Sequence, residues 1–134
     1  MRRVELGELR VGDVICRSIG PADLIHHTSI VVIVGTTLDD SYCSEIAIGA
    51  TRSVQRTLAE AGYTENDLYV IESGNNADIG DMRYRGCALG VRSWTYQLIS
   101  PYPISDTIGN CQTYVNHICR RCVIDEAAKW RGEK

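Results

Sequence analysis

The feature that most constrains the fold is a long β-branched run from Leu24 to Val34. Residues of this kind favour an extended strand, and the nearly continuous apolar character is typical of a strand buried in a core. Gly35 and the polar stretch from Thr36 to Ser41 end the run and predict a loop. With 134 residues, 44% of them hydrophobic, the chain can bury such a strand in one domain, which we take to be residues 1–134.

Shorter patterns predict the elements around this strand. A turn at Gly12-Asp13 within residues 9–15 leads into a first strand, and turn residues separate further expected strands at 42–48, 68–72, 82–89 and 93–99. Val54 and Leu58, followed by Gly62, predict a short helix over residues 51–61. The C-terminal tail, 123–134, is expected to be helical near residues 126–130. This order predicts an α+β fold, with packed helices on an antiparallel sheet.

A second segment places a cysteine at the start of a helix. Apolar residues follow Cys111 at the helical spacing of i, i+3, i+4 and i+7, namely Val115, Ile118, Cys119 and Cys122. Asn110 is a good N-cap residue, and Gly109 permits a tight entry. The unpaired N–H groups of this first turn, around Asn110 and Gln112, favour a thiolate and could hold an oxyanion. The alternative is that Cys111 is a small buried hydrophobe.

A nucleophilic cysteine needs a base, and the chain has three histidines. His117 is six residues after Cys111 on the expected helix, nearly on the opposite face, so it cannot reach the thiol. His26 and His27 lie at adjacent positions of the long strand and point to opposite faces, so one of them can face the Cys111 helix. A buried imidazole needs a partner, but that partner can equally be structural.

Charge and cysteine content limit the class of protein. The net charge is -3 and there is no block of four Lys or Arg residues, which argues against a nucleic-acid partner. The first residues are charged and have no apolar segment, so we expect no signal peptide. The longest strongly apolar run is too short to span a bilayer. We therefore expect a cytoplasmic protein whose six cysteines are reduced.

Two further patterns have simpler explanations than a binding site. His117, Cys119 and Cys122 have a zinc-ligand spacing, but the two cysteines fit the apolar stripe and no second close pair exists. We expect no metal and no other cofactor. Arginines also interleave with aromatic residues along two expected strands, at Arg83, Tyr84, Arg85, Arg92, Trp94 and Tyr96. This pattern would suit stacking on single-stranded nucleic acid, but it is more typical of the solvated face of a sheet.

Two short motifs resemble those of a known family. His27 to Val32, ending in a glycine at Gly35, resembles the H-box of the lecithin:retinol acyltransferase-like proteins. Asn110 to Val115 resembles their Asn-Cys box, and Gly12 to Ile15 is similar to the start of those domains. The resemblance spans about residues 9–122 and implies a circularly permuted papain-like (NlpC-type) domain, in which the histidine precedes the cysteine. The same motifs occur in non-protease 2A proteins of picornaviruses such as kobuviruses and parechoviruses.

The resemblance implies a role for each site residue. Cys111 would be the nucleophile, and His27 the general base and later the acid. Placing Tyr42 on the family's aromatic of the next strand puts Glu45 in the third position, usually a histidine, where a carboxylate can hold the imidazole tautomer. The alternative for Glu45 is a solvated strand edge. Thr28 departs from the family, which usually has an aromatic there.

Three functions follow from the resemblance. The first is a picornavirus 2A-like protein that supports viral RNA replication or binds host or viral proteins, without proteolysis and with vestigial acyl-transfer chemistry. The second is a thiol acyltransferase or phospholipase that takes a lipid acyl substrate. The third is a permuted papain-like peptidase or amidase. The sequence shows no hydrophobic C-terminal anchor of the kind that the cellular lipid-modifying members carry. We therefore expect the first function, and we expect no stable insertion in a membrane.

Overall fold

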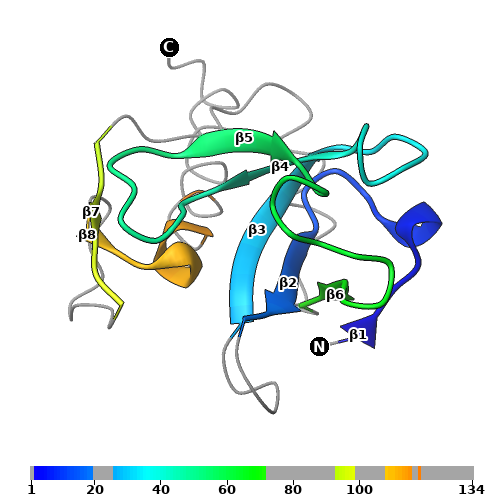
Figure 1. Ribbon diagram of the computed structural model, residues 1–134, viewed down its shortest axis with the longest axis horizontal. Helices are drawn as coiled ribbons and strands as arrows, with labels where there is room; N and C mark the ends of the chain where they lie inside the picture. The colour runs from blue at the N-terminus through cyan, green and yellow to red at the C-terminus, as the bar shows by residue number, and fades with distance from the viewer. Residues whose placement is uncertain (1, 20–25, 72–92, 99–107, 116–117, 119–134) are drawn as a thin grey trace, which may run out of the picture.

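The computed structural model describes residues 2–19, 26–71, 93–98, 108–115 and 118 (Figure 1). Six of its strands form one sheet in the order β1-β6-β2-β3-β4-β5, in which every neighbouring pair is antiparallel. These strands are β1 (Arg2–Arg3), β2 (Val14–Ser18), β3 (His26–Ile33), β4 (Tyr42–Glu45), β5 (Val54–Thr57) and β6 (Tyr69–Val70). A parallel pair, β7 (Thr95–Tyr96) and β8 (Ile108–Gly109), forms a second, small sheet.

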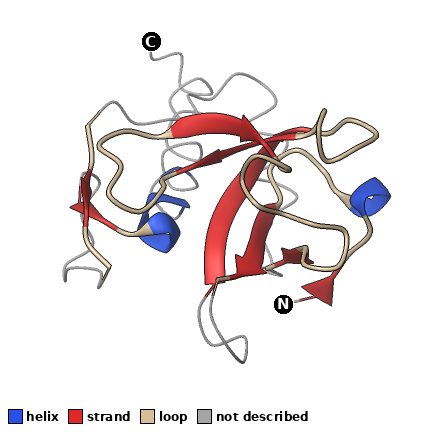
Figure 2. Cartoon of the chain, viewed as in Figure 1, coloured by secondary structure: helices blue, strands red, loops and turns tan. Residues whose placement is uncertain are grey.

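Helical structure is sparse in the described residues. A 3-10 turn, η1 (Leu6–Glu8), follows β1. One α-helix begins at Cys111, where residues 111–115 and 118 are helical, and we call it the Cys111 helix (Figure 2). The protein is thus a small α+β domain with a mostly antiparallel sheet, as expected. No described helix is long and apolar enough to cross a membrane.

The long β-branched run forms the central strand, because β3 pairs with β2 on one side and with β4 on the other. Its described part is His26–Ile33, and a register shift between Val31 and Ile33 marks a bulge near its end. The predicted turn before β2 is confirmed, because Gly12 has φ 95° and its N–H donates to the carbonyl of Val31.

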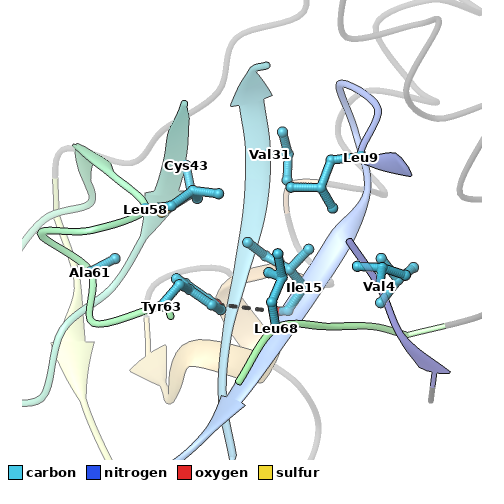
Figure 3. Close-up of a cluster of buried hydrophobic side chains, with 10 residues drawn as sticks. Val4, Leu9, Ile15, Val31, Cys43, Leu58, Ala61, Tyr63 and Leu68 are labelled. Carbon is cyan, nitrogen blue, oxygen red and sulfur yellow. Dashed lines mark hydrogen bonds between the residues drawn. The ribbon is translucent and has the colours of Figure 1, made fainter. Parts of the chain in front are cut away.

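Each face of β3 contributes to a separate apolar cluster. One face carries Val31, which packs in a cluster with Ile15 and Leu58, drawn in Figure 3. The opposite face carries Ile30, which packs against the Cys111 helix through Tyr114. Val4 belongs to the first cluster, so the core begins before residue 9. The two clusters bury most of the apolar side chains of the described sheet, and the second cluster packs the sheet against the Cys111 helix.

The helix predicted over residues 51–61 is wrong. Val54–Thr57 is strand β5, which pairs with β4 at the edge of the sheet, and the N–H of Leu58 then donates to the carbonyl of Ser41. Spacing alone suggested a helix, but pairing with β4 satisfies the same backbone groups and buries Leu58. One helical turn does follow β5, and Gly62, at φ 91°, ends it.

The other predicted strands are confirmed in shorter form. The strands expected at 42–48, 68–72 and 93–99 are Tyr42–Glu45, Tyr69–Val70 and Thr95–Tyr96. The strand expected at 82–89 and the helix expected near 126–130 lie outside the described residues. We expected packed helices on the sheet, and the described residues show one of them, the Cys111 helix.

Candidate active site

Cys111 is the first residue of its helix because Asn110 caps it. The Asn110 Oδ1 accepts the N–H groups of Gln112 at 3.0 Å and Thr113 at 3.1 Å. The Thr113 hydroxyl in return accepts the Asn110 N–H at 2.8 Å, which completes a reciprocal cap. The predicted N-cap is confirmed. Gly109 is required before it, because it has φ 151° and an added Cβ would collide with the Thr113 hydroxyl.

Aromatic contacts hold the helix against the sheet. The Tyr114 hydroxyl is hydrogen-bonded to the hydroxyl of Ser44 on β4 at 2.5 Å. The Trp94 ring stands edge-on to Tyr114, with centroids 5.8 Å apart and planes at 90°. The Trp94 Nε1–H donates to the carbonyl of Gly109 at 3.1 Å, next to the cap. The position of Cys111 is thus fixed from both the sheet and the β7–β8 segment.

His27 and the Cys111 helix belong to different faces of β3. Side chains alternate along a strand, so His27 is on the face of Val31, whereas Tyr114 of the helix packs with Ile30 on the other face. The two side chains nevertheless form a hydrogen bond to each other. They must therefore meet at the edge of β3 rather than over one of its faces.

The early end of β4 provides this meeting place. Successive N–H groups of β3 point alternately to β2 and to β4, and the Val31 N–H donates to Asp13 on the β2 side, so the Thr28 N–H points to the β4 side. In the register of the β3–β4 pair, β4 ends at Glu45, before it reaches the level of Thr28. The Thr28 N–H donates instead to the sulfur of Cys111.

Glu45 lies on the other side of His27. Its Oε2 contacts the His27 Nε2, and its Oε1 is 3.2 Å from the Nε of Arg56 on β5. Because Nε2 faces Glu45, the hydrogen bond between His27 and Cys111 must use the other ring nitrogen, Nδ1. Glu45 is 3% exposed, so the alternative of a solvated strand edge is wrong. The Cys111, His27 and Glu45 side chains thus form one chain of contacts.

A second set of polar side chains lies behind Glu45. The Ser29 hydroxyl is 3.5 Å from the Glu45 Oε2, and the Tyr63 hydroxyl donates to Ser29 at 2.9 Å. Tyr63 is buried and packs in the first apolar cluster. Burial raises the pKa of Tyr63 well above its usual value, so it stays a neutral donor. These bonds orient Ser29 toward the carboxylate of Glu45.

The pKa values of His27 and Cys111 move in the directions that an ion pair requires. Burial opposes the charged form of His27, but hydrogen bonds to Cys111 and Glu45 outweigh it and raise its pKa to about 9. Burial also opposes the Cys111 thiolate, but hydrogen bonds from His27 and from the Thr28 N–H lower its pKa below the usual value. Both shifts favour a Cys111 thiolate paired with a His27 imidazolium over the neutral thiol and imidazole.

The other two described cysteines have raised rather than lowered pKa values. Cys16 and Cys43 are buried and are not joined in a disulfide bond. Burial raises the pKa of Cys16 to about 11 and that of Cys43 to about 12. Within the described part of the chain, Cys111 is the thiol with a lowered pKa. It is not simply a small buried hydrophobe.

The structure assembles most of the predicted site. Cys111, His27 and Glu45 are in contact, whereas His26 is half-buried at the start of β3. Asn110 and Gln112 are engaged in the cap, and the Asn110 Nδ2 donates to the carbonyl of Leu98 at 3.1 Å. Their role at an oxyanion stays a prediction. Sequence reasoning missed several neighbours of the site, which are the Thr28 N–H, Ser29, Arg56 and Tyr63.

The weaker sequence hypotheses are tested only in part. Trp94 is buried in the second cluster and so presents no open face to a nucleic-acid base. Tyr84, the three arginines of the same pattern, His117, Cys119 and Cys122 lie outside the described residues or have no described side chain. Among the described residues, no group of three or more His, Cys, Asp or Glu side chains is arranged to hold a metal ion.

No family model matches, and no significant match was found among curated proteins or solved structures. The chemistry of the site must therefore be argued from its geometry. A thiolate paired with an imidazolium, next to a buried carboxylate, is equipped to attack an electrophilic carbon and then to protonate a leaving group.

Proposed function

We propose that the protein is a cysteine-dependent acyl-transfer enzyme. Cys111 would attack the carbonyl carbon of an ester or related acyl donor and form a thioester. The observation that carries this proposal is the continuous chain of contacts from the Cys111 sulfur through His27 to the carboxylate of Glu45. Nucleophile, base and orienting group are the three parts that covalent catalysis by a thiol needs.

Each step of the reaction has a described group to perform it. The Cys111 thiolate forms a bond to the carbonyl carbon, and the carbonyl π electrons move to oxygen. When the tetrahedral adduct collapses, the bond to the leaving group breaks and the His27 imidazolium gives that group its proton. An acceptor with an O–H group then gives its proton to His27 as it attacks the thioester and releases the Cys111 thiolate. The Glu45 side chain contacts the His27 Nε2 and holds the imidazole in place through both steps.

The motifs support an ester rather than a peptide as the acyl donor. The H-box at His27 and the Asn-Cys box at Cys111 resemble those of acyltransferase-like proteins whose cellular members act on phospholipid acyl chains. We accordingly propose a permuted papain-like domain that takes lipid acyl esters. A peptidase or amidase would use the same thiolate and imidazolium on an amide, and it differs only in the bond that is broken.

A second candidate is a binding protein of the picornavirus 2A type, with host or viral proteins as partners and a role in viral RNA replication. The observation in its favour is that Cys111 is only 6% exposed, which limits access to the sulfur. In that case the contacts among Cys111, His27 and Glu45 would stabilise the fold, and the domain would act in the host cytoplasm through its surface.

Trapping the acyl-enzyme separates the two candidates. The intact protein is mixed with p-nitrophenyl acetate, p-nitrophenyl octanoate or phosphatidylcholine micelles, and its mass is followed. We expect a mass increase equal to one acyl group, located on Cys111 by peptide mapping, and absent in Cys111→Ala and His27→Ala. A chain that folds normally but acquires no acyl group on Cys111 from any of these donors contradicts the enzyme and favours the binding protein.

A further inference from the structure

Glu45 is held between two cations. His27 contacts one of its carboxylate oxygens and Arg56 lies 3.2 Å from the other, while Glu45 itself is 3% exposed. The Arg56 side chain is 38% exposed, so it approaches the buried carboxylate from the surface. Neither the sequence pattern nor the family resemblance assigns a role to Arg56. It nevertheless contacts Oε1 of Glu45, the carboxylate oxygen that His27 does not contact.

Strand register places Arg56 at this position. Cys43 of β4 is opposite Arg56 of β5, and Glu45 lies two residues further along β4 on the same face as Cys43. A long side chain readily reaches the diagonal neighbour two residues away on the facing strand. The ion pair therefore depends on β5 forming a strand, since the expected helix over residues 51–61 would not create this register.

The other charged or titratable groups around Glu45 do not replace Arg56. Tyr63, from the segment after β5, and Cys43, on β4 itself, are neutral because burial raises their pKa values. Ser29 of β3 contributes a hydroxyl. Arg17 of β2 lies over the ring of Tyr63, 5.9 Å from its centroid, and its Nε donates to the carbonyl of Ala61.

We propose that Arg56 is a positioning residue for the Cys111–His27 pair, because it holds the Glu45 carboxylate in the orientation that faces His27. A carboxylate this deeply buried is costly unless its charge is compensated on both oxygens. With Arg56 present, both oxygens of the Glu45 carboxylate are engaged and Oε2 is held against His27. Without Arg56, Glu45 loses the contact that fixes its orientation, so its hydrogen bond to His27 weakens and the pKa of His27 falls.

The consequence reaches Cys111. A neutral His27 no longer stabilises the thiolate, so the pKa of Cys111 rises. If Arg56 instead only weakened the field of Glu45, its removal would strengthen the negative charge next to His27 and raise the His27 pKa. The two possibilities predict opposite shifts of the His27 pKa when Arg56 is removed. This inference rests on the site of the proposed enzyme, but it does not require acyl transfer, so the inference and the proposed function can fail separately.

The test is the pKa of His27, measured by ring 15N and 13C NMR in the full chain, together with the pH profile of Cys111 alkylation by iodoacetamide. In Arg56→Gln, we expect the His27 pKa to fall from about 9 toward about 6.5 and the Cys111 profile to move up by about one pH unit or more. Arg56→Lys keeps the charge and should restore much of both values. Arg52→Gln, at an exposed position before β5, makes the same change in net charge and should leave both values unaltered.

A double-mutant cycle shows whether Arg56 acts through Glu45. In a Glu45→Gln background, Arg56→Gln should produce no further shift of the His27 pKa. An unchanged or raised His27 pKa in Arg56→Gln, or a full additional shift in the Glu45→Gln background, would overturn the proposal. Circular dichroism of each variant establishes that the sheet is intact, and Arg56→Met, which also removes the charge, repeats the test if Arg56→Gln does not fold.

Discussion

The backbone N–H of Thr28 donates to the sulfur of Cys111, although Thr28 belongs to a central strand. It can do so because β4 ends at Glu45 and leaves this edge of β3 open at the level of Thr28. A backbone donor is fixed by the sheet and cannot rotate away. The thiolate of Cys111 is therefore stabilised by the fold as well as by His27, and the shape of the sheet is part of the site.

The lowered pKa of Cys111 predicts selective labelling. With iodoacetamide at pH 7, Cys111 should react before Cys16 and Cys43, whose pKa values burial raises to about 11 and about 12. Peptide mapping by mass spectrometry after a short exposure measures the order. Faster labelling of Cys16 or Cys43 in the folded protein would show that access, not thiolate formation, governs these thiols.

Glu45→Gln tests the carboxylate next to His27. The amide keeps the size of the side chain but cannot stabilise an imidazolium, so the His27 pKa should fall and that of Cys111 should rise. Each unit of that rise leaves up to about 10-fold less thiolate at pH 7, and the rate of alkylation should drop accordingly. Glu60→Gln, at an exposed carboxylate after β5, is the matched control and should alkylate like the unaltered protein.

His27 should make stability depend on pH. Its folded-state pKa is raised to about 9 from an ordinary value of about 6.5, so its stabilising contribution is complete below about pH 6.5 and is lost as the pH rises through about 9. Cys111 has the opposite shift, and its contribution is lost as the pH falls, which would mask the effect of His27.

Cys111→Ser removes the second titration and exposes the first. In this background His27 keeps Glu45 but loses the thiolate, so its pKa should be raised less than in the unaltered protein. The free energy of unfolding from urea curves should therefore decrease from about pH 6.5 upward and level off below about pH 9, by on the order of 1 kcal/mol. The same measurement on Cys111→Ser with His27→Gln should show no such decrease. Equal slopes in the two proteins would mean that Glu45 does not hold a proton on His27.

The cap of the Cys111 helix contributes to stability as well. Asn110→Ala removes the acceptor of the Gln112 and Thr113 N–H groups and should cost about 1 kcal/mol in the free energy of unfolding. Asn110→Ser keeps a capping oxygen and should recover most of this loss. If alanine and serine at this position are equally stable in urea unfolding, the cap does not determine where the helix starts.

Part of the fold and site could be predicted from local sequence. The cap at Asn110 is confirmed, and the two described residues of the stripe after Cys111, Val115 and Ile118, are buried in the second cluster, whereas Cys119 and Cys122 lie outside the described residues. Strand alternation could not choose between His26 and His27. It places His26, not His27, on the face against which the helix packs, and His27 reaches Cys111 only because β4 ends early.

The remaining features depend on long-range pairing. Glu45 was found through the family resemblance, and no local pattern indicates that it is buried against His27. Arg56 was missed because the spacing of Val54 and Leu58 suggested a helix, whereas only the register between β4 and β5 brings Arg56 to Glu45. Such registers are set by the whole sheet, and a single sequence carries no direct signal of them.

The pH dependence of Cys111 alkylation, compared between the native sequence and His27→Ala, tests the assembled thiolate–imidazolium pair most directly. We expect rapid alkylation with an apparent pKa clearly below about 8.5 in the native sequence and a return to about 8.5 or above in His27→Ala. A native profile with an apparent pKa of about 8.5 or higher, unchanged by His27→Ala, would contradict the pair and, with it, the proposed acyl-transfer chemistry.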